Sequence, residues 1–244
     1  MANSTGDQTH QQPPVFDAGP FEPTEAFAWG FAVLRTEPQR IGLPLIVAAF
    51  AMVVSATAVP SMLNGLVSAV TSGAPDSVLA NSLTALARLF GAGVALCVCA
   101  YVSTGVYPFV LNVARGRPVE FTDLFRHQRF ATRAVLMLGT ISIATAIGSA
   151  LCLLPGVLCV VATSMAMPLL LDADMTVVGA LRGSYELTRP HLMSVFVLCV
   201  FGLVAILAGM LLCFAGAVFV TMPVTLLAHA YAFLRLQGEN PVPA

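Results

Sequence analysis

Three arginines recur at helical spacing in the most basic stretch of the chain. Arg126, Arg129 and Arg133 lie at positions i, i+3 and i+7, so the interfacial helix expected around 121–129 would carry them on one face. Guanidinium groups near a charged membrane surface attract anionic lipid headgroups, with about 1 kcal/mol for each charge. The row is therefore a candidate headgroup-binding site. Arginines that only orient a chain in a membrane would produce the same pattern.

Other reactive side chains show no catalytic or metal-binding pattern. Cys97 and Cys99 are two residues apart, so on a helix they face different directions. His229 is the only ionisable side chain well inside a predicted span, and we expect it to be hydrogen-bonded near the interface. No HExxH, GxSxG, P-loop or GxGxxG motif occurs. We therefore expect no enzymatic activity, no cofactor and no metal site.

The composition excludes a soluble globular domain. Of the 244 residues, 58% are apolar and 9% are charged, and the mean hydropathy is +0.88. Soluble domains carry about 25% charged residues. A soluble fold of this size leaves too much surface exposed to hide so many apolar side chains. The sequence therefore predicts an all-α, polytopic membrane protein.

Six apolar segments are long enough to cross a hydrocarbon core of about 30 Å. They are about 41–62, about 88–110, two halves of 134–171 and two halves of 193–234. The two pairs of halves turn at Leu154-Pro155-Gly156 and near Ala215-Gly216, because proline cannot continue a helix and glycine tolerates a turn. The expected organisation is a disordered tail, a six-helix transmembrane domain and a short polar tail, over residues 1–23, 24–236 and 237–244.

Short helices at the membrane surface are expected to precede the pairs of spans. The first has an N-cap at Thr24 and ends before Pro38, and the last has a cap at Asp174 or Thr176 and ends at Thr188. A long outer loop over 64–81 joins the first two spans. Capping and ion pairing account for the carboxylates of Glu25, Asp123, Asp172, Asp174 and Glu186.

The arginines decide the expected orientation. The chain has eleven arginines and no lysine, and ten of the arginines fall on one side of the six predicted spans. Only Arg88 lies near the other side. Positive residues concentrate on the cytoplasmic side of membrane proteins. We therefore expect a multi-pass protein of the bacterial cytoplasmic (inner) membrane with both termini in the cytoplasm.

Proline and glycine landmarks suggest an internal repeat. Pro108 and Gly156 are 48 residues apart, and so are Pro168 and Gly216. Each unit would contain the cytoplasmic end of a span, an interfacial helix and an apolar hairpin. The first part of the chain fits the same plan more loosely. We expect three parallel copies of interfacial helix plus hairpin, with coincidence among the landmarks as the alternative.

Three glycines mark expected close contacts between helices. Gly202, Gly209 and Gly216 recur every seven residues. In lipid, small residues allow helix backbones to approach closely and gain dispersion energy. We expect packing within the chain, with homo-oligomerisation as the alternative.

Several short motifs carry a resemblance to known proteins. They are Ala114-Arg115-Gly116, Thr122-Asp123-Leu124-Phe125, Leu154-Pro155-Gly156, Pro168-Leu169-Leu170-Leu171-Asp172, Ala180-Leu181, Ser184 and Leu187-Thr188. Over about 24–236 the chain is similar to uncharacterised bacterial six-helix integral membrane proteins. These include YciC-like proteins and the membrane domain beside some glycerophosphoryl diester phosphodiesterases. The resemblance implies a six-helix fold and no chemistry, since the chain contains no phosphodiesterase catalytic domain.

Two functions remain open from these observations. The first is a non-catalytic membrane protein that assembles with lipids or partner proteins, or with copies of itself; no nucleic-acid partner is expected. The second is a small-solute transporter or permease-like protein. A transporter would need a polar path to the midplane, whereas a core filled with apolar side chains would favour the first function.

The orientation can be tested by labelling single cysteines in a cysteine-free background. An impermeant thiol reagent should reach a cysteine at Ser77 from outside the cell, but not one at Thr122, because the arginine distribution places Thr122 in the cytoplasm. Labelling of Thr122 from outside would disprove this topology.

Overall fold

The computed structural model describes residues 21–71, 78–212 and 216–243, and all regular secondary structure among them is helical. Within these residues, six helical stretches are long and apolar enough to cross a membrane. The prediction of an all-α protein with six candidate spans is confirmed. Residues 1–20 of the expected tail over 1–23, the labelling position Ser77 and the turn residue Ala215 lie outside the described residues.

Helix α1 (Pro23–Thr36) begins one residue before the predicted cap. Thr24 is not the N-cap, because Pro23 already occupies the first helical position, where its fixed φ and missing N–H cost nothing. Phe21 is buried just before the helix, so ordered packing starts ahead of Pro23. After α1, a π-helical turn, η1 (Pro38–Gly42), leads directly into the first long helix.

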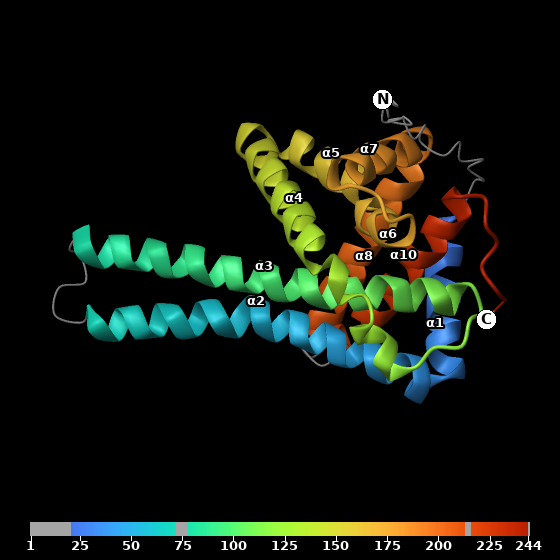
Figure 1. Ribbon diagram of the computed structural model, residues 1–244, viewed down its shortest axis with the longest axis horizontal. Coiled ribbons are helices and arrows are strands. Elements are labelled where there is room, and N and C mark those ends of the chain that lie inside the picture. The colour runs from blue at the N-terminus through green and yellow to red at the C-terminus, as the bar shows by residue number, and fades with distance from the viewer. Residues whose placement is uncertain (1–20, 72–77, 213–215, 244) are drawn as a thin grey trace, which may run out of the picture.

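The first hairpin is much longer than the sequence predicted. Helix α2 covers Leu43–Val70 and α3 covers Val78–Ala114, and the two pack side by side along their length (Figure 1). The expected loop over 64–81 is therefore wrong for its described residues. Hydroxyl groups in this region bond to carbonyls of their own helix, as Ser68 does to Gly65 and Ser82 to Val78, each over 2.8 Å. Polar residues can therefore stay helical here.

The second hairpin turns two residues earlier than predicted. Helix α4 (Ala131–Leu151) ends before Cys152, which is extended, and α5 (Leu153–Thr163) follows. Pro155 lies in the first turn of α5, where a proline does not interrupt the helical hydrogen bonds. A second, shorter helix, α6 (Ala166–Asp172), continues α5 after a turn.

The last third of the chain follows its prediction closely. Helix α7 (Val177–Thr188) has Thr176 as N-cap, with the Thr176 side chain accepting from the Gly179 amide over 3.2 Å. A 3-10 turn, η4 (Arg189–His191), leads into α8 (Leu192–Leu212). The final span consists of the π-helical turn η5 and the helix α10, at Ala217–Thr221 and Met222–Leu236.

The interfacial helix expected around 121–129 is not a continuous α-helix. Two 3-10 turns replace it, η2 (Phe121–Phe125) and η3 (Gln128–Phe130). In η2, the Asp123 carboxylate accepts from the Glu120 amide over 2.9 Å, and the Glu120 side chain accepts from the Asp123 amide. This reciprocal cap closes a tight turn. The region therefore differs from its expected counterpart α7, and the repeat stays a prediction.

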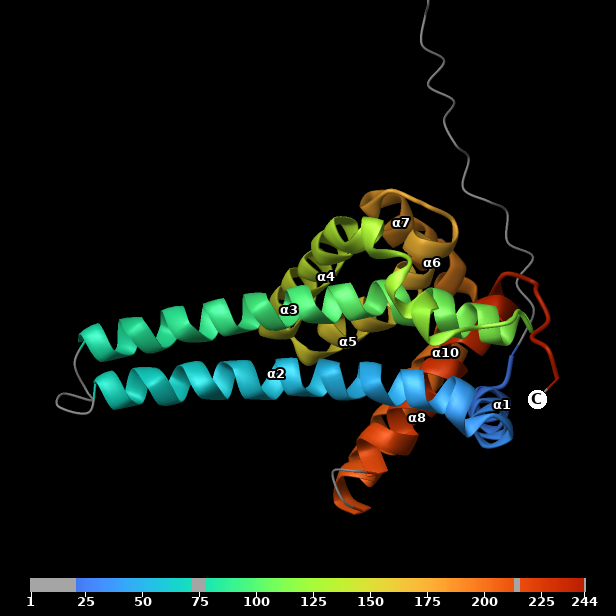
Figure 2. The ribbon, with the colours of Figure 1, turned by 60° about the horizontal axis from the view of Figure 1, so that its bottom comes forward.

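The helices meet at one end of the molecule, which we call the base. It comprises α1, α6, α7 and the C-terminal ends of α3 and α10, where large side chains such as Phe109, Leu169 and Phe233 are fully buried. From the base, the α2–α3 hairpin, the α4–α5 hairpin and α8 extend in different directions (Figures 1 and 2). The far halves of α2 and α3 expose many apolar side chains, as expected for a surface covered by lipid.

Two glycines on α3 provide a matched test of this packing. At Gly105 a Cβ atom would collide with the backbone carbonyl of Leu124 in η2, whereas at Gly93 no atom lies within 4 Å. Gly105→Ala should lower the free energy of unfolding by about 1–3 kcal/mol through overpacking. Gly93→Ala should leave it unchanged or raise it, since alanine favours a helix. Thermal unfolding in detergent, followed by circular dichroism, measures both. Equal melting temperatures would contradict the close crossing of η2 over α3.

Candidate functional site

The three arginines of the predicted row do not lie on one continuous helix, although Arg129 and Arg133 both lie against the Phe130 ring. Arg126 follows η2 and pairs with Asp123 over 3.1 Å, while Arg133 lies in the first turn of α4 and pairs with Asp174 over 2.6 Å. Arg129 lies in η3, with its Cζ atom 4.7 Å from the centroid of the Phe130 ring. The continuous helix that would have aligned them is replaced by two 3-10 turns. The prediction of one continuous helix that carries all three arginines is therefore wrong, and their binding of headgroups stays a prediction.

The structure instead gathers arginines around two adjoining cavities of about 330 and 240 Å³. Pro108 and Asn112 on α3 and His127 between the two 3-10 turns line both cavities. Arg126 and Arg129 line the larger one, and Arg115 and Arg117 the smaller one. We call this site the arginine basin, defined by Asn112, Arg115, Arg117, Arg126, His127 and Arg129.

Only part of the positive charge in the basin is neutralised. Arg115 and Arg126 are bound to Asp172 and Asp123, which also line the cavities. Arg117 makes a marginal contact of 3.5 Å with the amide oxygen of Asn112, and Arg129 contacts only an aromatic ring. Among the described residues, neither Arg117 nor Arg129 has a carboxylate partner. The charges of these two guanidinium groups are thus not neutralised by a carboxylate in the described part of the chain.

His127 adds an unused polar atom to the same place. Its Nδ1 atom is buried and has no hydrogen-bond partner among the described residues. A buried polar atom without a partner costs free energy, so a ligand that supplied one would be favoured there. Sequence analysis missed His127 and Asn112, because neither is marked by spacing or by charge.

Arg115 performs a structural role beside the basin. Its Nη1 and Nη2 atoms donate to the two carboxylate oxygens of Asp172 over 2.6 and 2.8 Å, and its Nε donates to Glu239 over 2.8 Å. The hydrogen bonds that Arg115 donates to Asp172, with those that it donates to Glu239, raise the pKa of Arg115 above its ordinary value. One guanidinium therefore joins the ends of α3 and α6 to the chain that follows α10.

The residues after α10 fold back across the base instead of forming a free tail. We call residues 237–243 the C-terminal strap. The Val242 amide donates to the Ala114 carbonyl over 2.9 Å, and the indole Nε1 of Trp29 donates to the Val242 carbonyl over 2.8 Å. Gly116 has a φ of +68°, and a Cβ atom there would lie 2.7 Å from the Val242 side chain. The strap thus connects α1 with the end of α3.

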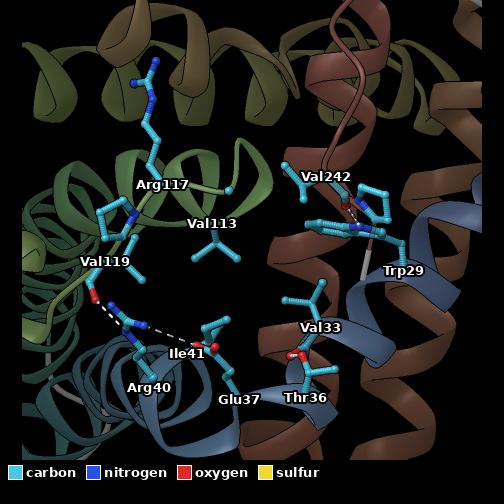
Figure 3. A pocket seen from close by; sticks show the side chains of 13 residues that line it. Trp29, Val33, Thr36, Glu37, Arg40, Ile41, Val113, Arg117, Val119 and Val242 are labelled. Carbon is cyan, nitrogen blue, oxygen red and sulfur yellow. Dashed lines mark hydrogen bonds and ion pairs between the residues drawn. The ribbon is translucent and has the colours of Figure 1, made fainter.

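A third cavity, of about 370 Å³, lies under the strap between α1, η1 and the loop after α3 (Figure 3). Its walls are mainly apolar and include Val33, Val113 and Val242. Arg40 at its floor donates from Nε to the Val119 carbonyl over 3.2 Å and lies 3.9 Å from Glu37. The charged groups at the floor are thus already engaged with neighbouring atoms. Arg117 also lines this cavity, and its side chain extends away from Glu37 and Arg40 in Figure 3.

The glycines of the predicted packing motif lie at short distances from neighbouring atoms. A Cβ atom on Gly202 would lie 3.1 Å from Cγ2 of Thr225 on α10. A Cβ atom on Gly216 would lie 3.3 Å from the carbonyl oxygen of Gly209 on α8, and Gly209 is buried. The first approach joins α8 to α10, and the second joins α8 to the residue before η5, both within one chain.

The remaining candidate residues stay separate from the basin. The Nδ1 atom of His229 lies 2.8 Å from the Thr225 carbonyl within α10. Over the part of the chain that the structure describes, no group of three or more His, Cys, Asp or Glu residues is placed to hold a metal ion. Cys97 and Cys99 are free thiols, and Cys213 lies outside the described residues.

Comparison with known proteins finds a distant homologue. The chain is 27% identical over 255 aligned positions to the uncharacterized protein Rv2560 of Mycobacterium tuberculosis, which covers 98% of this chain and 74% of the relative. The uncharacterized protein Mb2590 of Mycobacterium bovis matches to the same extent. No family model matches the chain, and no solved structure matches it. The resemblance to YciC-like proteins stays a prediction, and the homologues name no function.

The contribution of Arg115 to stability can be measured against a second ion pair. The Arg115 side chain is 15% exposed and holds two carboxylates, whereas Arg182 is 76% exposed and holds Glu186 over 3.0 Å. Arg115→Gln should lower the free energy of unfolding by about 1–3 kcal/mol, because charged hydrogen bonds are lost and Asp172 is left without a counter-ion. Arg182→Gln should cost less than about 0.5 kcal/mol.

Melting temperatures in detergent compare the two variants. The fluorescence of Trp29, the single tryptophan of the chain, reports on the strap. Arg115→Gln should shift the emission to longer wavelength as the strap loosens. Equal melting temperatures together with unchanged emission would contradict a stabilising role for Arg115.

Proposed function

We propose that this chain is a non-catalytic multi-pass membrane protein that binds anionic lipid headgroups through the arginine basin, and that it assembles with lipids or partner proteins. The observation that carries the proposal is the pair of guanidinium groups, Arg117 and Arg129, that line the basin without carboxylate partners. Phosphate oxygens are strong acceptors for guanidinium donors. A membrane protein meets such oxygens in the headgroup layer of its own bilayer.

An apolar groove next to the basin supports a lipid as the ligand. The 3-10 turn η2 lies between the arginine basin and the groove. Its polar residue Asp123 lines the basin, while Phe121, Leu124 and Phe125 line a groove of about 100 Å³ against α2 and α3. A headgroup in the basin and an acyl chain along the groove would then meet surfaces of matching polarity.

We further propose that the base faces the cytoplasm and that both termini lie there. The basic residues at the ends of the predicted spans support this orientation, because positive residues are retained on the cytoplasmic side. In this orientation the basin would face the anionic cytoplasmic leaflet. The bacterial inner membrane is the location that agrees with it.

The three-copy organisation also belongs to the proposal. Each pair of spans is preceded by a short amphipathic segment: α1 before α2–α3, η2 and η3 before α4–α6, and α7 before α8–α10. The order along the chain supports three related units. In this organisation the middle unit differs from the other two, because its interfacial segment consists of 3-10 turns.

A transporter is the alternative that the interior supports less well. The cavity between α4, α5 and α8, of about 310 Å³, is lined mainly by apolar residues such as Val157, Val160 and Phe196. Thr145 and Ser149 are its hydroxyl-bearing residues, and the Thr145 hydroxyl is buried without a partner among the residues that the structure describes. Saturable flux of a solute in proteoliposomes that falls with Thr145→Val would favour the transporter over lipid binding.

Lipid binding is tested by removing the two unpaired guanidinium groups. Arg117→Gln/Arg129→Gln should reduce the retention of anionic lipid roughly tenfold or more, because each charge near the headgroups is worth about 1 kcal/mol. The loss should be larger at low salt, where screening is weakest. Native mass spectrometry of the purified protein with bound lipid measures the retention.

A control double variant with the same change in net charge distinguishes an effect of the basin from an effect of the overall charge. Arg35 and Arg182 are exposed arginines outside the basin, so Arg35→Gln/Arg182→Gln should retain lipid nearly as the unaltered chain does. Cysteine labelling of each variant confirms that its topology is unchanged. Equal losses in both double variants would mean that overall charge, and not the basin, holds the lipid.

A further inference from the structure

The cavity of about 310 Å³ between α4, α5 and α8 shares no lining residue with the arginine basin. Val161 is buried in its wall, and Cys199 is half-buried. The exposed apolar side chains of the wall are those of Val160, Phe196, Val200 and Leu203, so the cavity is open on one side. All three helices belong to candidate membrane spans. The opening therefore faces the surface that the bilayer covers.

The polar groups of this cavity lie at its end away from the base. Helix α4 runs from the base to Leu151, and Thr145 and Ser149 lie within about 9 Å of that end at the usual rise per residue. Val161 and Phe196 lie nearer to the base, because α5 leads into α6 and α8 follows α7. The lining of the cavity therefore becomes less polar toward the base.

The hydroxyl of Thr145 differs from two other threonine hydroxyls of the same hairpin. Thr140 and Thr163 donate to the carbonyls four residues earlier in their own helices, over 2.8 and 2.7 Å. The Oγ1 atom of Thr145 is buried and has no hydrogen-bond partner among the described residues. In a hydrocarbon core no water can satisfy such a group. A ligand that brought an acceptor to Thr145 would remove this cost.

A glycerolipid in the leaflet opposite the base matches this arrangement. Helix α4 has 21 residues and measures about 30 Å, so its far end reaches the opposite hydrocarbon boundary when the base lies at the first one. The ester carbonyls of such a lipid lie near that boundary and can accept from Thr145 or Ser149. Its acyl chain extends toward the membrane centre, along the apolar part of the cavity. The polarity of the ligand and that of the cavity thus change in the same direction.

We infer that the cavity between α4, α5 and α8 binds one acyl chain of a glycerolipid from the leaflet opposite the base, with Thr145 donating to an ester carbonyl. The volume of about 310 Å³ lies at the lower end of the range of ligand pockets, about 300–1,000 Å³, and suits one chain better than a whole lipid. This site goes beyond the arginine basin. It recognises a chain and an ester, and it does not depend on the charge of the headgroup.

The probe is a phosphatidylcholine with a photoactivatable diazirine in one acyl chain, in nanodiscs of unlabelled phosphatidylcholine. Its headgroup has no net charge, so attraction to the basin does not contribute. Mass spectrometry of the digested protein identifies the labelled segments. Labelling around Val160 and Val200 should reach a plateau as the mole fraction of the probe rises. Labelling around Met62, which is exposed on the far half of α2, should rise in proportion, as expected for contact with bulk lipid.

Filling the cavity should remove the saturable labelling. Val200→Phe places a ring in the space of the acyl chain, so it should lower the labelling of α5 roughly fivefold or more through overpacking. Val54→Phe is the matched control, because Val54 lies on α2 outside the cavity and is 39% exposed, as Val200 is. Val54→Phe should leave the labelling of α5 unchanged.

Two probes test the hydrogen bond. Thr145→Val removes the hydroxyl and keeps the shape of the side chain, so it should lower labelling by the ester-linked probe roughly threefold, as expected for one hydrogen bond in a membrane. An ether-linked probe with the same chain has no carbonyl, so Thr145→Val should leave its labelling unchanged. Thr140→Val should affect neither probe, because the Thr140 hydroxyl is bound within its own helix. Circular dichroism confirms that each variant is folded, and Thr145→Val decides the matter even if Val200→Phe does not fold.

Three results would overturn the inference. Labelling of α5 that never reaches a plateau and is equal in all variants would mean that the cavity meets only bulk lipid. Equal effects of Thr145→Val on the ester and ether probes would remove the proposed hydrogen bond. Saturable solute flux that falls with Thr145→Val would place a transported solute in the cavity.

The basin variant separates this inference from the proposed function. Arg117→Gln/Arg129→Gln should leave the labelling of α5 unchanged, since the two sites share no lining residue. Unchanged retention of anionic lipid in that variant would overturn the proposed function and leave the acyl-chain site in place. Loss of the saturable labelling in that variant would overturn the inference of a separate site.

Discussion

The ion pairs of Arg115 are the interaction on which the base of this protein depends. One guanidinium binds Asp172 at the end of α6 with two bonds and Glu239 in the strap with a third. In lipid, no hydrophobic force draws helices together, so polar bonds and close packing must fix their arrangement. Arg115 supplies such bonds where three parts of the chain meet. The helical hairpins can then extend from the base in different directions while the segments of the base stay together.

The arginines near the base differ in whether a carboxylate of the described chain holds them. Arg115, Arg126 and Arg133 each hold a carboxylate, and their charges are largely used within the protein. Arg117 and Arg129 hold none among the described residues and line cavities near the ends of the helices. Within a short stretch of chain, some arginines are thus neutralised inside the protein and others are not. The difference lies in what each side chain meets after folding.

The length of α3 places a second constraint on how the protein sits in a membrane. Its 37 residues extend over about 55 Å at the usual rise, against about 30 Å for a hydrocarbon core. The end of α3 in the base is buried, while its other end exposes Leu79, Leu86 and Phe90. A helix of this length must tilt or project beyond the hydrocarbon. The hairpin that it forms with α2 is therefore longer than a span perpendicular to the membrane requires.

Local patterns in the sequence determined the class of the protein and most of its helices. Apolar content predicts membrane helices wherever it occurs, and Thr176 caps α7 through a contact only three residues away. The boundaries at Val70 and Val78 escaped prediction, because hydroxyl groups such as that of Ser68 bond to their own helix and keep a polar stretch helical.

The basin and the strap were decided only by the tertiary structure. Arg115 meets partners 57 and 124 residues away, and Trp29 meets Val242 across 213 residues. No spacing rule connects such distant residues. The helical period suggested a row of three arginines on one helix. A reciprocal cap at Asp123 instead closes a 3-10 turn, so the three arginines lie on different elements. The sequence therefore shows where the arginines lie along the chain. Only the packing of distant segments determines which of them meet a carboxylate.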